Sequence, residues 1–143
     1  VLGNTQLRRY QDNLYCLDAG QQPWSFKTIV FITQEYVAIK PQRQQMMVGK
    51  PQEGALCSVS VAAAEGHFSL SQPVLSLPVK PVGETHHKPL KQWFKQWQVP
   101  PWERSDWLLL SDTEQPLALV GKGRIIALSA TGQYQFSLQL YAL

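Results

Sequence analysis

The residues with the clearest chemistry in this sequence are lysines at helical spacing. Lys91 and Lys95 stand one helical turn apart, and no carboxylate lies between residues 88 and 98 to neutralise them. Like charges at this spacing destabilise a helix by about 0.2–0.5 kcal/mol, whereas phosphate groups bound to both lysines would turn that cost into a gain. The spacing therefore favours an anion-binding helix face, with lysines that simply extend into water as the alternative.

The basic residues of the chain gather around this predicted helix. Residues 80–104 hold five basic and two acidic side chains, an excess that equals the net charge of +3 of all 143 residues. A local excess of this kind attracts nucleic acid or an acidic surface. The candidate nucleic-acid-binding residues are Lys80, Lys88, Lys91, Lys95 and Arg104.

No pattern in the sequence indicates catalysis, a cofactor or a metal ion. The adjacent histidines His86 and His87 lack a third ligand at a recognisable spacing, and neighbours in a loop do not easily chelate one ion. Gly121 and Gly123 form a G-x-G, but between two predicted strands, which is typical of a turn. The sequence has no G-x-S-x-G, H-E-x-x-H or P-loop pattern. We therefore predict no catalytic, cofactor-binding or metal-binding residue in this chain.

Composition is typical of a globular protein without a membrane span. Hydrophobic residues make up 44% of the chain and charged residues 16%, which is below the usual ~25%. No apolar run approaches the ~20 residues that a membrane-spanning helix needs, and the first residues do not resemble a secretory signal. Cys16 and Cys57 read as small buried side chains of a cytoplasmic protein, with a disulfide as the alternative. The chain opens on Val1, which suggests a piece excised from a longer protein.

One amphipathic helix is predicted over about residues 88–98. Its apolar face repeats at i, i+3, i+4 and i+7 and consists of Leu90, Trp93, Phe94 and Trp97. Pro89 suits the first helical turn, and Pro100-Pro101 would end the helix. A helix that covers a sheet needs such a face, so we predict that these side chains are core, with stacking on bases as the alternative.

The rest of the sequence reads as short strands. A hairpin is predicted over residues 7–17, around a turn at Gln11-Asp12-Asn13. Further strands are expected in 26–32, 36–40, 55–64, 106–110 and 116–143, with edge or bulged strands in 66–83, where three prolines intervene. Residues 41–54, with two prolines and two glycines, are predicted to form a long loop.

These elements add up to an α+β fold that is mainly β. We expect short-stranded sandwich or barrel-like sheets with one amphipathic helix. We divide the chain into a β-rich segment, residues 1–72, and a C-terminal domain, residues 73–143.

Residues 86–110 resemble the C-terminal domain of the bacterial tRNA(Ile)-lysidine synthetase family. That family carries a run of the type K-L-K-K-x-x-x-x-x-G-[IV]-P-P-W-x-R-x-x-x-P-L-L. The matching positions are Lys88, Leu90, Lys91, Val99, Pro100, Pro101, Trp102, Arg104, Leu109 and Leu110. Residues 2–17 resemble the R-R-Y-x-x-x-L-[WY] pattern by which the family's chain enters its C-terminal region.

The sequence departs from the family pattern at several positions. Gln92, Gln98 and Leu108 stand where the family has a lysine, a glycine and a proline. The basic segment before the helix, often R-x-R-x-G-[GD]-R, keeps only Lys80 and Gly83. These losses weaken the expected phosphate contacts of residues 78–84 more than those of the helix.

The resemblance implies a PheT/TilS-domain-like fold and a role in tRNA modification. The family's three-part cytoplasmic ligase uses ATP in an N-terminal domain to adenylate the wobble cytidine of tRNA(Ile), and lysine then displaces AMP. The S-G-G-x-D-S loop of that domain is absent here. ATP and lysine would therefore be used elsewhere, and this chain alone would bind without catalysing.

By the same resemblance, the chain would hold the acceptor stem of tRNA(Ile). Its partners would be that tRNA and the catalytic domain of the same polypeptide, with a homodimer left open. Trp102 would be a buried residue that fixes the turn after the helix. The alternative function is a structural or protein-docking β module without nucleic-acid contact.

Overall fold

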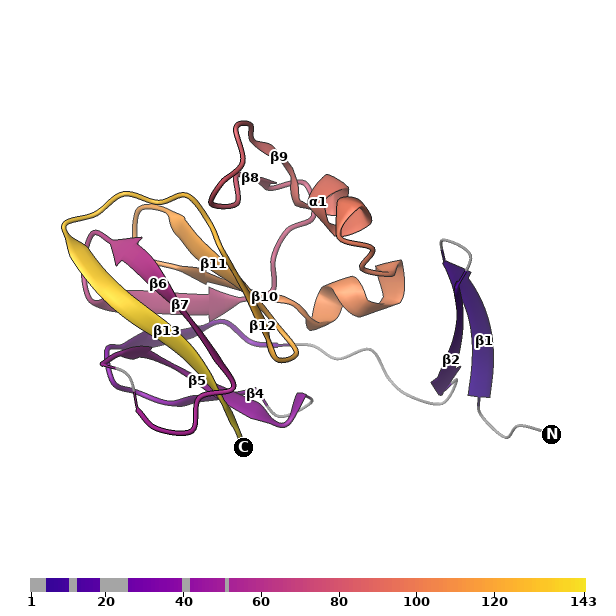
Figure 1. Cartoon of the computed structure of the whole chain (residues 1–143), viewed down its shortest axis with the longest axis horizontal. Coiled ribbons are helices and arrows are strands. Elements are labelled where there is room, and N and C mark those ends of the chain that lie inside the picture. The colour runs from indigo at the N-terminus through magenta and orange to yellow at the C-terminus, as the bar shows by residue number, and fades with distance from the viewer. Residues whose placement is uncertain (1–4, 11–12, 19–25, 40–41, 51) are drawn as a thin grey trace.

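The computed structural model describes residues 5–10, 13–18, 26–39, 42–50 and 52–143, with side chains from Phe26 onward (Figure 1). The strands are β1 (Thr5–Tyr10), β2 (Asn13–Asp18), β3 (Ile29–Ile32), β4 (Val37–Ile39), β5 (Gln44–Gly49), β6 (Cys57–Ala63), β7 (His67–Ser71), β8 (Pro78–Val79), β9 (Lys88–Pro89), β10 (Leu108–Ser111), β11 (Pro116–Gly121), β12 (Arg124–Ala127) and β13 (Tyr134–Ala142). The helices are α1 (Leu90–Gln96) and the 3-10 helix η2 (Pro101–Asp106). The predicted fold class, mainly β with one short α-helix, is confirmed.

Two antiparallel sheets pack face to face. One has the strand order β12-β11-β10-β7-β3, and the other has the order β4-β5-β13-β6. Between them lies a core to which both sheets contribute, including Phe31 and Phe68 from the first and Leu138 from the second. Strands from both sides of residue 72 share these sheets, and the division into 1–72 and 73–143 stays a prediction.

A second core lies on the outer face of the five-stranded sheet. Side chains alternate between the two faces of a strand, so Leu108 and Leu110 enter the core between the sheets while Leu109 points the other way. Leu109 packs with the aromatic face of α1. The molecule is therefore three layers deep here: sheet, sheet and helix (Figure 1).

Most predicted strands are found where the sequence placed them. The hairpin is confirmed in its backbone, with Thr5 opposite Asp18 and Tyr10 opposite Asn13. Asn13 belongs to β2, while the other two residues of the predicted turn lie outside the described residues. The prediction that 66–83 would form edge or bulged strands is wrong for β7, which lies between β10 and β3 because it ends before the first of the prolines.

The predicted long loop over residues 41–54 is also wrong, because it contains β5. This strand lies between β4 and β13, and Met46, Met47 and Val48 are completely buried. In the sequence, prolines stand on both sides of this strand. The strand can begin with the polar residue Gln44 because its buried side-chain amide forms hydrogen bonds. The Gln44 amide donates to the Gly121 carbonyl at 2.8 Å and accepts from the Gly123 N–H at 2.9 Å.

Helix α1 is shorter than predicted, and local hydrogen bonds explain both ends. Lys88–Pro89 pairs with β8 as β9, so the helix begins at Leu90. Gln98 adopts a left-handed φ of 59°. The Val99 N–H then donates to the Phe94 carbonyl at 2.8 Å, and the Gln98 N–H donates to the Lys95 carbonyl at 3.2 Å. This pattern ends the helix before the two prolines are reached.

Replacing Gln98 by glycine is expected to raise the free energy of unfolding by about 0.5–1 kcal/mol. A left-handed conformation is unfavourable for residues with a Cβ, and glycine is the residue preferred at this helix position. Urea unfolding of the two proteins measures the change. Gln92→Gly, an exposed position inside α1, is the control and should cost about 1 kcal/mol. A loss of stability in Gln98→Gly like that of the control would contradict the explanation.

Candidate nucleic-acid interface

Helix α1 separates an apolar face from a basic face. Leu90, Trp93 and Phe94 are buried against the five-stranded sheet, as predicted. Lys91 and Lys95 are exposed on the other side. The first turn of α1 contains no acidic residue, so the helix dipole and Lys91 oppose each other. Lys95 lies in the last turn, where the dipole favours a positive charge, so only Lys91 is unfavourable to the helix.

Trp93 fixes the position of α1. Its Nε1–H donates to the Val79 carbonyl of β8 at 2.8 Å, which ties the helix to the β8–β9 hairpin. Its ring stacks on Trp97, with 5.8 Å between the ring centroids. The Lys88 ammonium lies 4.6 Å from the centroid of the Trp93 ring. This cation–π contact holds Lys88 close to the start of the helix.

The stack of indoles continues beyond α1. Trp97, which is only half-buried, also stacks on the buried Trp107 at 6.4 Å. The guanidinium of Arg124 lies 5.7 Å from the Trp107 ring. A Cβ on Gly121 would come within 2.9 Å of that ring, so glycine makes room for it. A row of three indoles therefore has a cation at each end, Lys88 and Arg124.

Arg104 lies near the C-terminal end of α1. It is half-buried on η2, and its Nε–H donates to the Val99 carbonyl at 3.0 Å. Burial raises the pKa of Glu103 and Asp106 on the same element, and the charge of Asp106 raises that of Glu103 further.

Trp102 is less buried than predicted. It is half-buried and belongs to neither core cluster, so the expectation of a core residue is wrong. Trp107, five residues later, occupies the core position instead.

Lys80 is held in place by its backbone. Its carbonyl accepts from the Ser129 N–H at 2.8 Å, and the Val82 N–H donates to the Ala127 carbonyl at 3.0 Å. The segment after β8 is thereby attached to the end of β12. The Lys80 side chain is half-buried and lines a cavity together with His87. Of the five predicted residues, Lys91 and Lys95 lie on α1, Lys88 and Arg104 lie on the elements before and after it, and Lys80 lines this cavity.

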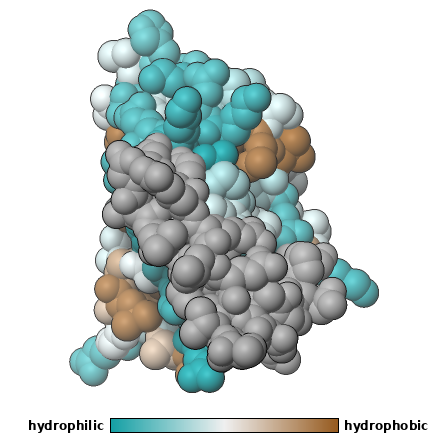
Figure 2. All heavy atoms as spheres, turned by 90° about the vertical axis from the view of Figure 1, so that its right-hand side faces the viewer, coloured by the Kyte–Doolittle hydropathy of each residue, from teal (hydrophilic) through white to brown (hydrophobic). Residues whose placement is uncertain are grey.

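The basic face is hydrophilic and has few acidic neighbours. Figure 2 shows that the upper part of this side of the molecule, over α1 and the β8–β9 hairpin, is mainly hydrophilic. Within the described part of the chain, no carboxylate lies within salt-bridge distance of Lys88 or Lys91. Phosphate groups could thus approach these two lysines without displacing an ion-pair partner.

The sequence analysis did not single out two basic residues, Arg124 and Lys50, or the buried side-chain amide of Gln44. Arg124 directly follows the Gly121–Gly123 turn, whose glycines alone were considered. Lys50 falls in the predicted loop, and Gln44 gave no signal of burial. The stacking of Arg124 on Trp107 depends on side chains 17 positions apart, so no local pattern reveals it.

Chemistry of other kinds finds little support in the described residues. No three His, Cys, Asp or Glu side chains among them gather into a metal-binding group. The Cys57 thiol is free, and burial raises its pKa, while the Cys16 side chain lies outside the described residues. No helix in the described ranges is long and apolar enough to cross a membrane.

Residues 74–136 match the family described as the TilS substrate C-terminal domain. TilS abbreviates tRNA(Ile)-lysidine synthetase. Over this segment the chain is similar to a TilS-type C-terminal domain. The segment runs from the end of β7 through α1 and η2 into β13, and it contains all five candidate residues. The resemblance seen in the sequence is thereby confirmed over these residues.

A solved structure supports the TilS-type fold. The structure titled "Crystal structure of TILS C-terminal domain" superimposes with a TM-score of 0.55 and 16% sequence identity. The alignment covers 82% of this chain and 98% of that chain, so the shared fold extends beyond residues 74–136. No curated protein matches the chain.

Proposed function

We propose that this chain is the tRNA-binding C-terminal portion of a tRNA(Ile)-lysidine synthetase. One observation carries the proposal: the segment that matches the TilS C-terminal domain presents Lys91 and Lys95 on the exposed face of a helix whose other face is buried. The helix is anchored by Trp93, so its lysines have a fixed base from which to reach an RNA backbone.

The basic row along α1 suits the acceptor stem of a tRNA. A-form RNA hides its base edges in a deep, narrow groove, so a domain of this kind reads shape, phosphates and 2′-hydroxyl groups more than sequence. Lys88, Lys91, Lys95 and Arg104 would contact successive phosphates, and Arg124 extends the row beyond the indole stack.

In this proposal the chemistry takes place in another domain of the same polypeptide. The complete cytoplasmic enzyme would ligate lysine to the wobble cytidine of tRNA(Ile) at the expense of ATP. This portion would position the tRNA, and the catalytic domain would bind ATP and lysine. The partners of the chain would be the tRNA and that domain, with a homodimer as a further arrangement.

The double variant Lys91→Ala/Lys95→Ala tests the proposal. It is expected to weaken tRNA binding and to reduce the slope of log affinity against log salt concentration by up to about two. Each phosphate contact that is lost reduces the number of counterions that binding releases from the RNA. Fluorescence anisotropy over a range of salt concentrations measures both quantities.

The control is Gln92→Ala/Gln96→Ala, which alters the same exposed face at the same spacing without removing charge. It should leave the salt dependence unchanged. If the lysine variant kept the wild-type slope but bound the catalytic domain less tightly, a protein-docking module would be the better description.

A further inference from the structure

Two adjacent cavities form a groove on the side of the molecule that carries β6 and the start of β13. Their volumes are about 700 and 430 Å3. Both are lined by Ser60 of β6 and Gln135 of β13, so one continues into the other. Ser58 and Ser60 are exposed while Val61 is buried, which follows from the alternation of side chains along β6.

The first cavity ends at a rigid turn that carries Lys50. Gln34 donates its N–H to the Val48 carbonyl at 2.8 Å, and its side-chain oxygen accepts from the Lys50 N–H. Gly49, between these residues, has a positive φ of 151°, and a Cβ there would collide with the Gln34 side chain. The backbone around Lys50 is therefore fixed, and this cation stands at one end of the groove.

The second cavity ends at Lys80 and His87. Its polar lining also includes the hydroxyl-bearing residues Ser129 and Thr131, and its apolar lining includes Val61 and Leu128. The backbone hydrogen bonds that attach the segment after β8 to the end of β12 form its wall. This end of the groove is thus built from paired backbone, with the Lys80 ammonium at its border.

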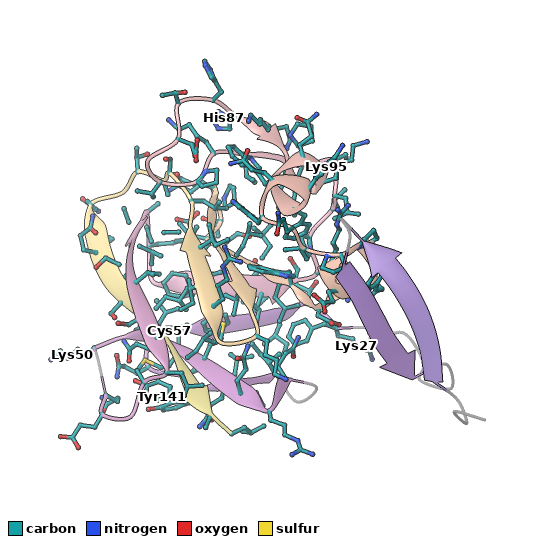
Figure 3. The ribbon with its side chains drawn as sticks, turned by 45° about the vertical axis from the view of Figure 1, so that its right-hand side comes forward. Lys27, Lys50, Cys57, His87, Lys95 and Tyr141 are labelled. Atoms are coloured by element: carbon teal, nitrogen blue, oxygen red, sulfur yellow. The ribbon has the colours of Figure 1, made fainter. Side chains whose placement is uncertain are left out.

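Among the described residues, no carboxylate lines the groove. Neither cavity is lined by an Asp or a Glu, although the chain contains ten of these residues. With Lys50 at one end and Lys80 at the other, the charge complements a polyanion that lies along the groove. Figure 3 places Lys50 at the left edge of the molecule, His87 at the top and Lys95 of α1 to the right of His87.

An exposed aromatic ring lies next to the first cavity. Tyr134 is 47% exposed at the start of β13, and its ring stacks on Phe136 at 6.2 Å. Phe136 itself lines the first cavity. Bases of single-stranded nucleic acid stack on such rings, whereas bases inside a double helix cannot reach them. Each cavity has the volume of a site for one small-molecule ligand, which suits unpaired nucleotides in succession.

We infer that this groove binds single-stranded RNA that continues from the double helix held at α1. The inference rests on the proposed function, because it assigns to the same RNA a second, separate binding surface. Lys50 and Lys80 contact phosphates, the serine and threonine hydroxyls contact sugar or phosphate oxygens, and Tyr134 provides the stacking surface.

Two RNA ligands and two substitutions on one strand test the inference. The ligands are a minihelix with a blunt end and the same minihelix with a single-stranded 3′ extension. Wild-type protein is expected to bind the extended minihelix about tenfold more tightly, as one stacked base and a few phosphates would provide. Ser60→Glu places a carboxylate where the two cavities meet and should abolish that advantage.

Ser58→Glu is the matched control. It introduces the same charge on the same face of β6, two residues away, at a position that lines neither cavity. It should keep the tenfold advantage, and both variants should bind the blunt minihelix equally. Thermal unfolding monitored by circular dichroism verifies that both are folded.

The inference is overturned if the extension adds no affinity to wild-type protein, or if Ser58→Glu and Ser60→Glu reduce the advantage equally. A failure of the proposed function looks different, because the blunt minihelix would then not bind or would be insensitive to Lys91→Ala/Lys95→Ala. Equal binding of a polyglutamate peptide in place of the extension would show a general anion surface and would also contradict the inference.

Discussion

Replacing Trp93 by alanine is expected to lower the free energy of unfolding by about 3–5 kcal/mol. The side chain is only 1% exposed and packs in the second core, between α1 and the outer face of the five-stranded sheet. Alanine would leave a cavity, remove the hydrogen bond to the Val79 carbonyl and end the indole stack at Trp97. Guanidinium unfolding followed by far-ultraviolet circular dichroism measures the loss.

Two comparisons make the Trp93 result specific. Trp93→Phe keeps a buried ring but leaves the Val79 carbonyl without its donor, so it should cost less than Trp93→Ala. Trp97→Ala should also cost less, because this indole is half-buried. Equal losses for Trp93→Ala and Trp97→Ala would contradict the assignment of Trp93 as the anchor of the helix.

Replacing Asp112 by alanine is expected to destabilise the protein by about 3 kcal/mol. This buried carboxylate accepts backbone N–H groups from Ala64 at 2.9 Å, Glu114 at 2.8 Å and Gln115 at 2.9 Å. It joins the end of β6 to the turn between β10 and β11. Alanine would leave three donors without their acceptor, and the same unfolding experiment measures the cost.

The contribution of Asp112 should depend on pH. Burial by itself raises the pKa of Asp112, but the hydrogen bonds from Ala64, Glu114 and Gln115 outweigh it and hold the pKa below its ordinary value of about 3.9. A lowered pKa means that the stabilisation is complete above the ordinary value and is lost as the pH falls through the lowered one. The stability difference between wild type and Asp112→Asn should therefore shrink in acid. Glu114→Gln, which removes an exposed carboxylate from the same turn, is the control and should show a much smaller difference.

The sequence predicts the helix well because its signal is local. Leu90, Trp93 and Phe94 repeat with the helical period, and their burial follows from that spacing alone. The start of the helix is misplaced because Lys88–Pro89 forms hydrogen bonds with β8, a partner that periodicity does not show. Pairing of Lys88–Pro89 with β8 therefore sets the first residue of the helix.

Strand β5 shows why the rest could not be predicted. Gln44 and Gln45 look like loop residues, yet Gln44 is 2% exposed and satisfied by the turn between β11 and β12, almost eighty positions away. The groove could not be predicted for the same reason, since Lys50, Ser60 and Lys80 line neighbouring cavities only after the sheets have formed. By contrast, the pair Lys91 and Lys95 is visible in the sequence because one helix carries both residues.

Strands β10 and β11 supply both cores, and this limits how such a domain can change in evolution. A one-residue insertion in β10 would exchange the environments of Leu109 and its neighbours Leu108 and Leu110, so two packed interiors would be disrupted by a single event. Gains and losses of residues should therefore collect in connections such as residues 80–87. That segment borders the proposed groove. Changes in its length would therefore alter the proposed RNA contacts while the two sheets and the helix stay the same.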